Sequence, residues 1–227
     1  MLRALACVGC KACYHPFMTQ KPTHDFPLWG HDDDLISTVQ ADGQMHHRVV
    51  AWDSVEIVIG RGGKAELELD MAAIQAEGVP VSRRRGGGCA VVLDQGNVIV
   101  SAVAPRPGIG EVTQAFRDFT AWMIAGLAAV GLTGVTSDGV SDLVLDNRKI
   151  GGSCIYRTRG LVYYSTTLLV SPDLDAIERY LPHPPREPDY RAGRCHREFL
   201  GILQSPELRS AAQLAEALQE GLAPILK

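Results

Sequence analysis

Two short stretches carry residues whose types and spacing could do chemistry. The first, from Val81 to Asn97, reads VSRRRGGGCAVVLDQGN and places Arg83, Arg84 and Arg85 directly before three consecutive glycines. Glycines permit backbone conformations and close approaches that other residues exclude. Guanidinium groups beside exposed backbone N–H groups form a concavity that suits a phosphate or a carboxylate. The stretch therefore predicts an anion site, with a glycine-rich hairpin that bears a solvated basic face as the plain alternative.

The second stretch runs from Ser141 to Cys154 and reads SDLVLDNRKIGGSC. Its pattern predicts a strand, a turn at residues 146–147, and a second strand broken by the glycine pair 151–152. Lys149 stands between the turn and the glycines, at the rim of the expected sheet. Its ammonium group could there meet an anionic, acyl-activated substrate, although an isolated lysine at such a place is usually an ordinary surface residue.

A third group of reactive side chains crowds the amino end. Its pattern, Cys-x-x-Cys-x-x-Cys-x-His, offers three thiolates and an imidazole to zinc, or part of an iron–sulfur ligand set. No second Cys-x-x-Cys follows, so a thiol-rich leader, or a stretch that precedes a true start at Met18 or Met45, stays open as the alternative. The candidate metal ligands are Cys7, Cys10, Cys13 and His15. The remaining cysteines are scattered, which favours a reducing compartment over a disulfide framework.

Length and composition limit the class of protein. The chain has 227 residues, of which 46% are apolar and 21% charged, and no linker divides it, so we expect one large domain. A net charge of -4 gives no general basic surface for nucleic acid or an acidic membrane. No run approaches the roughly 18 apolar residues of a membrane span. The apolar run at the amino end is too short for a signal peptide. We therefore expect a cytoplasmic protein that binds neither nucleic acid nor membrane.

The elements that must position these residues follow from hydrophobic periodicity. Strands are expected at 48–52, 54–60, 98–104 and 159–170, in addition to those that flank the two glycine stretches. Helices are expected at 69–78, 109–131, 173–181 and 206–226, and the acidic run 32–34 suits the first turn of another. The helix at 109–131 has apolar residues at spacings of three and four, which predicts that one face packs on a sheet.

Together these pieces resemble the superfamily of lipoate-protein ligases and octanoyltransferases, which shares its catalytic fold with biotin-protein ligase. The resemblance spans residues 32–203. It is carried by IGR at 59–61, PVSRRRGGGCAVVLDQGN at 80–97, SDLVLDNRKIGGS at 141–153 and TLLVSPDLDAIERYL at 167–181. A glycine run alone is a weak signal, but both glycine motifs in this order make a specific one.

The resemblance implies an α+β fold, in which a single catalytic domain of the biotin- and lipoate-protein ligase type has mixed and antiparallel sheets flanked by helices. We expect this domain at residues 31–227, with no accessory carboxy-terminal domain. Residues 1–30 form the leader, which is rich in Cys, Pro and His and is expected to be poorly ordered.

The resemblance also implies roles for individual residues. Lys149 would contact the acyl carbonyl and phosphate oxygens, and the loop at 84–88 would hold the phosphate side of an acyl-adenylate. The expected substrate- and adenylate-binding residues are Arg84, Arg85, Gly86, Gly87, Gly88, Cys89, Asp142, Gly151, Gly152 and Ser153. The expected supporting residues are Arg61, Asp94 and Asn97.

The function that this implies is ATP-dependent ligation. The enzyme would use ATP and Mg²⁺ to activate lipoate or octanoate as the acyl-adenylate, and would transfer the acyl group to a lysine of a carrier domain. The expected partners are a lipoyl-carrier protein, such as the E2 subunit of a 2-oxoacid dehydrogenase or a glycine-cleavage H-like protein, and an accessory ligase subunit supplied by a separate chain.

Two alternatives stay open, because the chain departs from the family's pattern. Gly86 stands where the family usually has a serine, and Ser165 where it has a histidine. The first alternative is an ATP-independent octanoyltransferase that needs no cofactor and forms a thioester on Cys154, or else on Cys89. The ammonium group of Lys149 would lower the pKa of the Cys154 thiol. The second is a non-catalytic lipoyl-binding relative.

Overall fold

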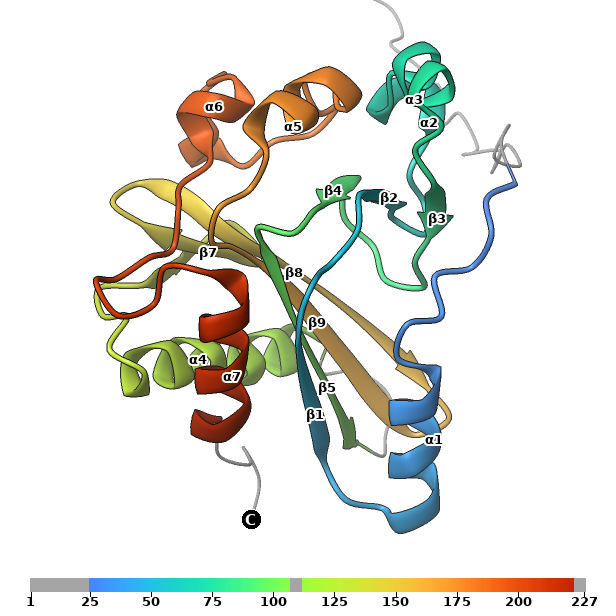
Figure 1. Cartoon of the computed structure of the whole chain (residues 1–227). Coiled ribbons are helices and arrows are strands. Elements are labelled where there is room, and N and C mark those ends of the chain that lie inside the picture. Colours follow the sequence, from blue (N-terminus) through green and yellow to red (C-terminus); the bar gives the residue numbers. More distant parts are fainter. Residues whose placement is uncertain (1–24, 107–111, 223–227) are drawn as a thin grey trace, which may run out of the picture.

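A six-stranded antiparallel sheet forms the centre of the fold (Figure 1). The computed structural model of the protein describes residues 25–106 and 112–222. Strand order in the large sheet is β1-β5-β9-β8-β7-β6, and every neighbouring pair is antiparallel. Its strands are β1 (His46–Ala51), β5 (Asn97–Pro105), β6 (Thr136–Asp138), β7 (Asp142–Leu145), β8 (Arg148–Thr158) and β9 (Leu161–Leu169).

A smaller sheet carries the arginine and glycine stretch. Its order is β3-β2-β4, with β2 parallel to β3 and antiparallel to β4. The strands are β2 (Glu56–Ile59), β3 (Val81–Arg83) and β4 (Val91–Leu93). The helices α2 (Ala65–Glu68) and α3 (Met71–Glu77) lie between β2 and β3 in the chain, beside this sheet in Figure 1.

The two faces of the large sheet are covered by different helices. Alternate residues of β5, such as Val98 and Val100, point into the main core with α4 (Val112–Ala129) and α7 (Ala211–Gly221). On the other face, Val103 packs with α1 (Asp33–Asp42). The loop that carries the glycines reaches this second face, so the candidate site lies on the α1 side of the sheet.

The expected fold class is confirmed, and several predicted element boundaries follow from local chemistry. Helix α3 ends at Gly78, whose φ of +65° is the left-handed conformation that glycine adopts readily. Helix α5 (Leu174–Tyr180) begins after Asp173, whose carboxylate accepts hydrogen bonds from the N–H groups of two residues in its first turn. Asp146 and Asn147 both have positive φ, as the turn between β7 and β8 requires.

Other expectations need correction. Strand β8 is not broken at residues 151–152, because the glycines continue the pairing with β9 and only the register with β7 shifts. Helix α7 is shorter than residues 206–226, since Ser210 caps it and it begins at Ala211. The short helices η1 (Asp189–Arg191) and α6 (His196–Phe199) were not expected at all.

Some expectations cannot be compared with the structure. The candidate metal ligands Cys7, Cys10, Cys13 and His15, and most of the proposed leader, lie outside the described residues. Within the described ranges, no cluster of His, Cys, Asp and Glu side chains could hold a metal ion. No helix in that same part of the chain has the length and apolar character needed to cross a membrane.

Candidate functional site

The glycine loop is held by its backbone against the end of β2. The N–H of Arg61 donates to the carbonyl of Gly86 at 2.8 Å. A Cβ on Gly60 would lie 2.0 Å from the carbonyl oxygen of Gly88, so no larger residue fits there. Gly88 itself has a φ of +93°. Close backbone approach therefore explains two of the glycines without any ligand.

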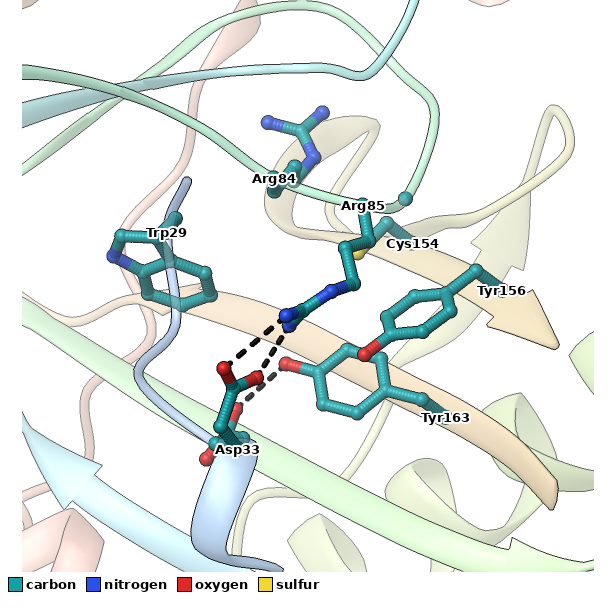
Figure 2. Close-up of a pocket in the computed structure, with 9 residues that line it drawn as sticks. Trp29, Asp33, Arg84, Arg85, Cys154, Tyr156 and Tyr163 are labelled. Carbon is teal, nitrogen blue, oxygen red and sulfur yellow. Dashed lines mark hydrogen bonds and ion pairs between the residues drawn. The ribbon is translucent and has the colours of Figure 1, made fainter. Parts of the chain in front are cut away.

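Arg84 braces this loop from inside. Its guanidinium group donates to the carbonyl oxygens of Val58 at 2.8 Å, Gly87 at 2.8 Å and Cys89 at 2.7 Å. Figure 2 shows the side chain pointing away from the neighbouring cavity. Arg83 likewise donates to backbone carbonyls, at Gly60 and Gly63. In this structure, the guanidinium groups of Arg83 and Arg84 are bonded to backbone carbonyls and fix the shape of the loop.

Arg85 points the other way and crosses a small cavity to reach Asp33 at the start of α1 (Figure 2). The cavity is bounded by Trp29, Tyr156 and Tyr163 as well as this ion pair. Its volume of about 10 Å³ leaves room for about one water molecule. The ion pair therefore occupies the space between the glycine loop and the large sheet.

Lys149 lies on the same face of β8 as the glycine loop but does not line that cavity. Its Nζ is 2.8 Å from Oδ1 of the buried Asp142. The end of its side chain covers Gly152, where a Cβ would lie 2.9 Å from Nζ. A residue larger than glycine at position 152 would push the ammonium group away. Asp142 and Gly152 thus set where the ammonium group lies.

Gly86 and Cys154 connect the loop to the strand that carries Lys149. A Cβ on Gly86 would lie 2.7 Å from Sγ of Cys154. Because side chains alternate along a strand, Gly152 and Cys154 face the same side of β8. The glycine loop and Lys149 therefore sit over consecutive positions of one strand face. This is the observation that brings the two predicted motifs together.

The thiol of Cys154 does not have the chemistry expected of a nucleophile. Burial raises its pKa, and the nearby charge of Arg84 only partly opposes this. The charge that opposes the rise is that of Arg84, and Lys149 is not among the groups that shift this pKa. Ser153 is also displaced from its expected role, since its hydroxyl group lies on the opposite face of β8, 2.8 Å from the hydroxyl group of Tyr164.

Cys89 is the thiol whose environment is affected by Lys149. Burial is the largest effect and raises its pKa, while the charges of Arg186, Lys149 and Arg84 oppose the rise. Its Sγ also contacts the carbonyl of Arg186 at 3.9 Å. The charges of Lys149 and of Arg186, in the segment before η1, therefore act on the end of the glycine loop.

Two of the predicted supporting residues, Asp94 and Asn97, build the turn between β4 and β5. Oδ1 of Asp94 accepts from the N–H of Gly96 at 2.6 Å, and Oδ2 accepts from the N–H of Asp173 at 2.8 Å. Oδ1 of Asn97 accepts from the N–H of Asp94 at 2.8 Å. Both side chains are buried. They join the glycine loop's exit strand to the start of α5 and do not approach the cavity.

A comparison of the sequence with known protein families identifies one match that includes this site. Residues 29–199 match the family described as the lipoyl protein ligase A/B catalytic domain. The chain belongs to the lipoyl protein ligase A/B catalytic domain family. The match covers both glycine stretches, Lys149, and the segment that contains η1 and α6.

Individual relatives and solved structures are similar to this chain at low sequence identity. A lipoate–protein ligase of Streptococcus pyogenes is 28% identical over 174 residues, which cover 76% of this chain and 47% of that protein. The bipartite lipoate protein ligase of Thermoplasma acidophilum has a TM-score of 0.67 at 22% identity, covering 87% of this chain and 82% of that one. A lipoate-protein ligase A bound with ATP has a TM-score of 0.65 at 23% identity, covering 82% and 75%. The chain spans between 40% and 47% of the length of the curated relatives it matches.

Three residues around the candidate site have no role in the expectations from the sequence. Asp33 is expected only as part of a helix start, and neither Tyr156 nor Tyr190 is a predicted site residue. The alternation that puts Cys154 on one face of β8 also puts Tyr156 there, so that signal was present. No local pattern connects Asp33 to Arg85 or Tyr190 to Asp142, because each pair is far apart in the chain.

Proposed function

We propose that the protein is an ATP-dependent ligase that activates lipoate or octanoate and transfers it to a lysine of a carrier domain. The observation that carries this proposal is the placement of the glycine loop and Lys149 over consecutive positions of one face of β8. This arrangement suits an acyl carboxylate that enters between a backbone loop and a cation. The family membership and the names of the relatives support the same reaction.

The acyl chain would occupy the cavity beside Tyr156 and Tyr163. This requires Arg85 to leave Asp33, since the cavity is otherwise too small. The exposed fractions of the two side chains are 34% and 52%, and such partly exposed ion pairs are worth roughly 0.2–1 kcal/mol. Burying an acyl chain offsets that cost, because each buried CH₂ contributes about 0.8 kcal/mol.

Lys149 would stabilise the reacting carboxyl group. The carboxylate attacks the α-phosphate of ATP and displaces pyrophosphate, and the amine of the carrier lysine then attacks the acyl carbon and releases AMP. Negative charge is carried by the α-phosphate oxygens in the first step, and in the second it builds up on the acyl oxygen and then on the bridging oxygen that leaves with AMP. An ammonium group fixed beside them lowers the barrier of each. Asp142 keeps this ammonium group on the correct face before the substrate arrives.

ATP and Mg²⁺ are part of this proposal as a pair. A solved structure with the same fold is described as bound with ATP. Mg²⁺ is usually held by substrate phosphates and one or two carboxylates, so we expect it to enter with the nucleotide. An enzyme that consumes ATP works where ATP is abundant, which supports the expectation of a cytoplasmic protein.

The proposed partners are a lipoyl-carrier domain and an accessory ligase subunit. The structure of Thermoplasma acidophilum is described as a bipartite ligase with its E2 lipoyl domain, and this chain covers 82% of the matched chain. We therefore propose that a separate subunit assists adenylation here as well. The first assay should include both the chain alone and the chain with a bipartite ligase's small subunit.

The test is formation of lipoyl-AMP from lipoate, ATP and Mg²⁺, followed by mass spectrometry. We expect the wild-type protein to form it and Lys149→Ala to form it at least about a hundredfold more slowly, because one transition-state contact is typically worth that much. Lys64→Ala is the control, since Lys64 precedes α2 away from β8 and should leave the rate unchanged. Absence of lipoyl-AMP with either subunit composition would contradict the proposal.

The transferase alternative has less support. It needs a reactive thiolate, and the burial that raises the pKa of Cys154 disfavours one. Incubation with an octanoylated carrier protein in the absence of ATP separates the two reactions. An octanoyl thioester on Cys154 or Cys89 would favour the transferase, and its absence together with lipoyl-AMP formation would favour the ligase.

A further inference from the structure

The segment from η1 through α6 to Gly201 packs beside Lys149 at the start of β8. The N–H of Gly201 donates to the carbonyl of Lys149 at 2.8 Å, and Lys149 also pairs with Leu200 in an isolated parallel bridge. Arg194 donates to the carbonyl of Asn147 at 3.0 Å and to the carbonyl of Tyr190 at 2.7 Å. This segment is therefore fixed both to the start of β8, where Lys149 lies, and to the turn before it.

Within this segment, the ring of Tyr190 is held in place by neighbouring side chains. It packs against Phe199 with 5.1 Å between the ring centroids. The guanidinium groups of Arg191 and Arg194 lie over the same phenylalanine, at 4.8 Å and 5.4 Å from its centroid. A ring held in this way directs its hydroxyl group to one place.

That place is the carboxylate that holds Lys149. The hydroxyl group of Tyr190 donates to Oδ2 of Asp142 at 2.9 Å, and Oδ1 of the same carboxylate is 2.8 Å from Nζ of Lys149. Asp142 is only 7% exposed, so these two contacts determine its orientation. Burial and the charge of Asp142 raise the pKa of Tyr190, so its hydroxyl group keeps its proton and remains a donor at neutral pH.

We propose that Tyr190 is a positioning residue for Lys149, which it controls through the shared carboxylate of Asp142. Two donors on one carboxylate divide its negative charge, so the hydroxyl group weakens the hold of Asp142 on the ammonium group as well as orienting it. Lys149 can then turn toward an acyl carboxylate without losing a full ion pair. The inference deepens the proposed ligase function and rests on it for the role of Lys149.

The first test is independent of catalysis and measures the reactivity of Lys149 in Tyr190→Phe. The chain has five lysines, and the exposed Lys64 is an internal reference in the same molecule. Brief labelling with a low concentration of acetyl-N-hydroxysuccinimide, read by peptide mass spectrometry, gives the ratio of the two rates. We expect the Lys149:Lys64 ratio to fall about threefold in Tyr190→Phe, because the ammonium group is held more firmly by Asp142. An unchanged or higher ratio overturns the proposal.

The matched control is Tyr180→Phe. Tyr180 also donates its hydroxyl proton to a carboxylate, Glu77, at 2.6 Å, but it lies on α5 away from the lysine. This variant should keep the wild-type labelling ratio. A melting temperature within a few degrees of wild type confirms that each variant is folded, and the unchanged ring of phenylalanine preserves the packing on Phe199.

The second test is the rate of lipoyl-AMP formation. We expect Tyr190→Phe to lower kcat about tenfold while KM for lipoate changes less than about twofold, since the hydroxyl group touches neither substrate. A rise in KM with unchanged kcat would contradict a positioning role. If the wild-type protein forms no lipoyl-AMP, the proposed function fails, and the labelling ratio still decides whether Tyr190 controls Lys149.

Discussion

At the scale of single residues, Gly86 and Cys154 behave as a matched pair. The family usually has a serine at the position of Gly86, and in this chain the space for its Cβ is filled by the sulfur of Cys154. In this chain Cys154 therefore leaves no room for a side chain at position 86.

This pairing predicts the stability of three variants. Gly86→Ala alone should destabilise the protein by about 1–3 kcal/mol, the usual cost of an overpacked contact. Adding Cys154→Ala should recover most of that loss, because it removes the sulfur that the new methyl group would meet. Urea unfolding of the single and double variants measures the coupling.

The neighbouring glycine supplies the control for this cycle. A Cβ on Gly87 would meet no atom within 4 Å, so Gly87→Ala should change the free energy of unfolding by less than about 0.5 kcal/mol. If Gly86→Ala is as mild as Gly87→Ala, or if Cys154→Ala does not rescue it, the two residues are not packed as described.

At the scale of elements, α6 links the fold's stability to pH. His196, its first residue, is buried at 8% exposure, and its Nε2 lies 3.3 Å from the carbonyl of Pro182. Burial, with the charge of Arg191, lowers its pKa below 6.5. The unfolded chain therefore binds a proton at a higher pH than the folded one. The stability that the buried, neutral imidazole of His196 contributes is complete above pH 6.5 and is lost as the pH falls through the folded-state pKa of His196.

The corresponding prediction compares two histidine variants. Between about pH 7.5 and about pH 5.5, the wild-type protein should lose more stability than His196→Gln does, by urea midpoint. His183→Gln is the surface control for the substitution itself, because His183 is half exposed and contacts Glu187. Equal pH dependence in the wild-type protein and His196→Gln would show that folding does not lower the pKa of His196.

The elements were largely predictable from the sequence, and the site was only partly so. Periodicity, Gly78 and Asp173 defined helices α3 and α5, since these signals act within one turn of the chain. The two glycine motifs were recognised as one site. The directions of Arg84 and Arg85 were not, because carbonyl oxygens of Val58 and Cys89 and the carboxylate of Asp33 compete for them only after folding.

At the scale of the whole molecule, the site lies where the small sheet meets the α1 face of the large one. Each sheet supplies what the other lacks. The small sheet presents the glycine loop, and the large sheet presents Lys149, Gly152 and Cys154 on β8. The ion pair between Arg85 and Asp33 closes the space between them (Figure 2). Substrate entry therefore requires a change in side-chain position at this junction.

The central claim is that one acyl carboxyl group is held between the glycine loop and Lys149. A crystal structure of the protein with lipoate tests it most directly. We expect a carboxyl oxygen within hydrogen-bond distance of Nζ of Lys149, the acyl chain in the cavity beside Tyr156, and Arg85 turned away from Asp33. Lipoate bound elsewhere, or bound in the cavity with its carboxyl group directed away from Lys149, would contradict the claim.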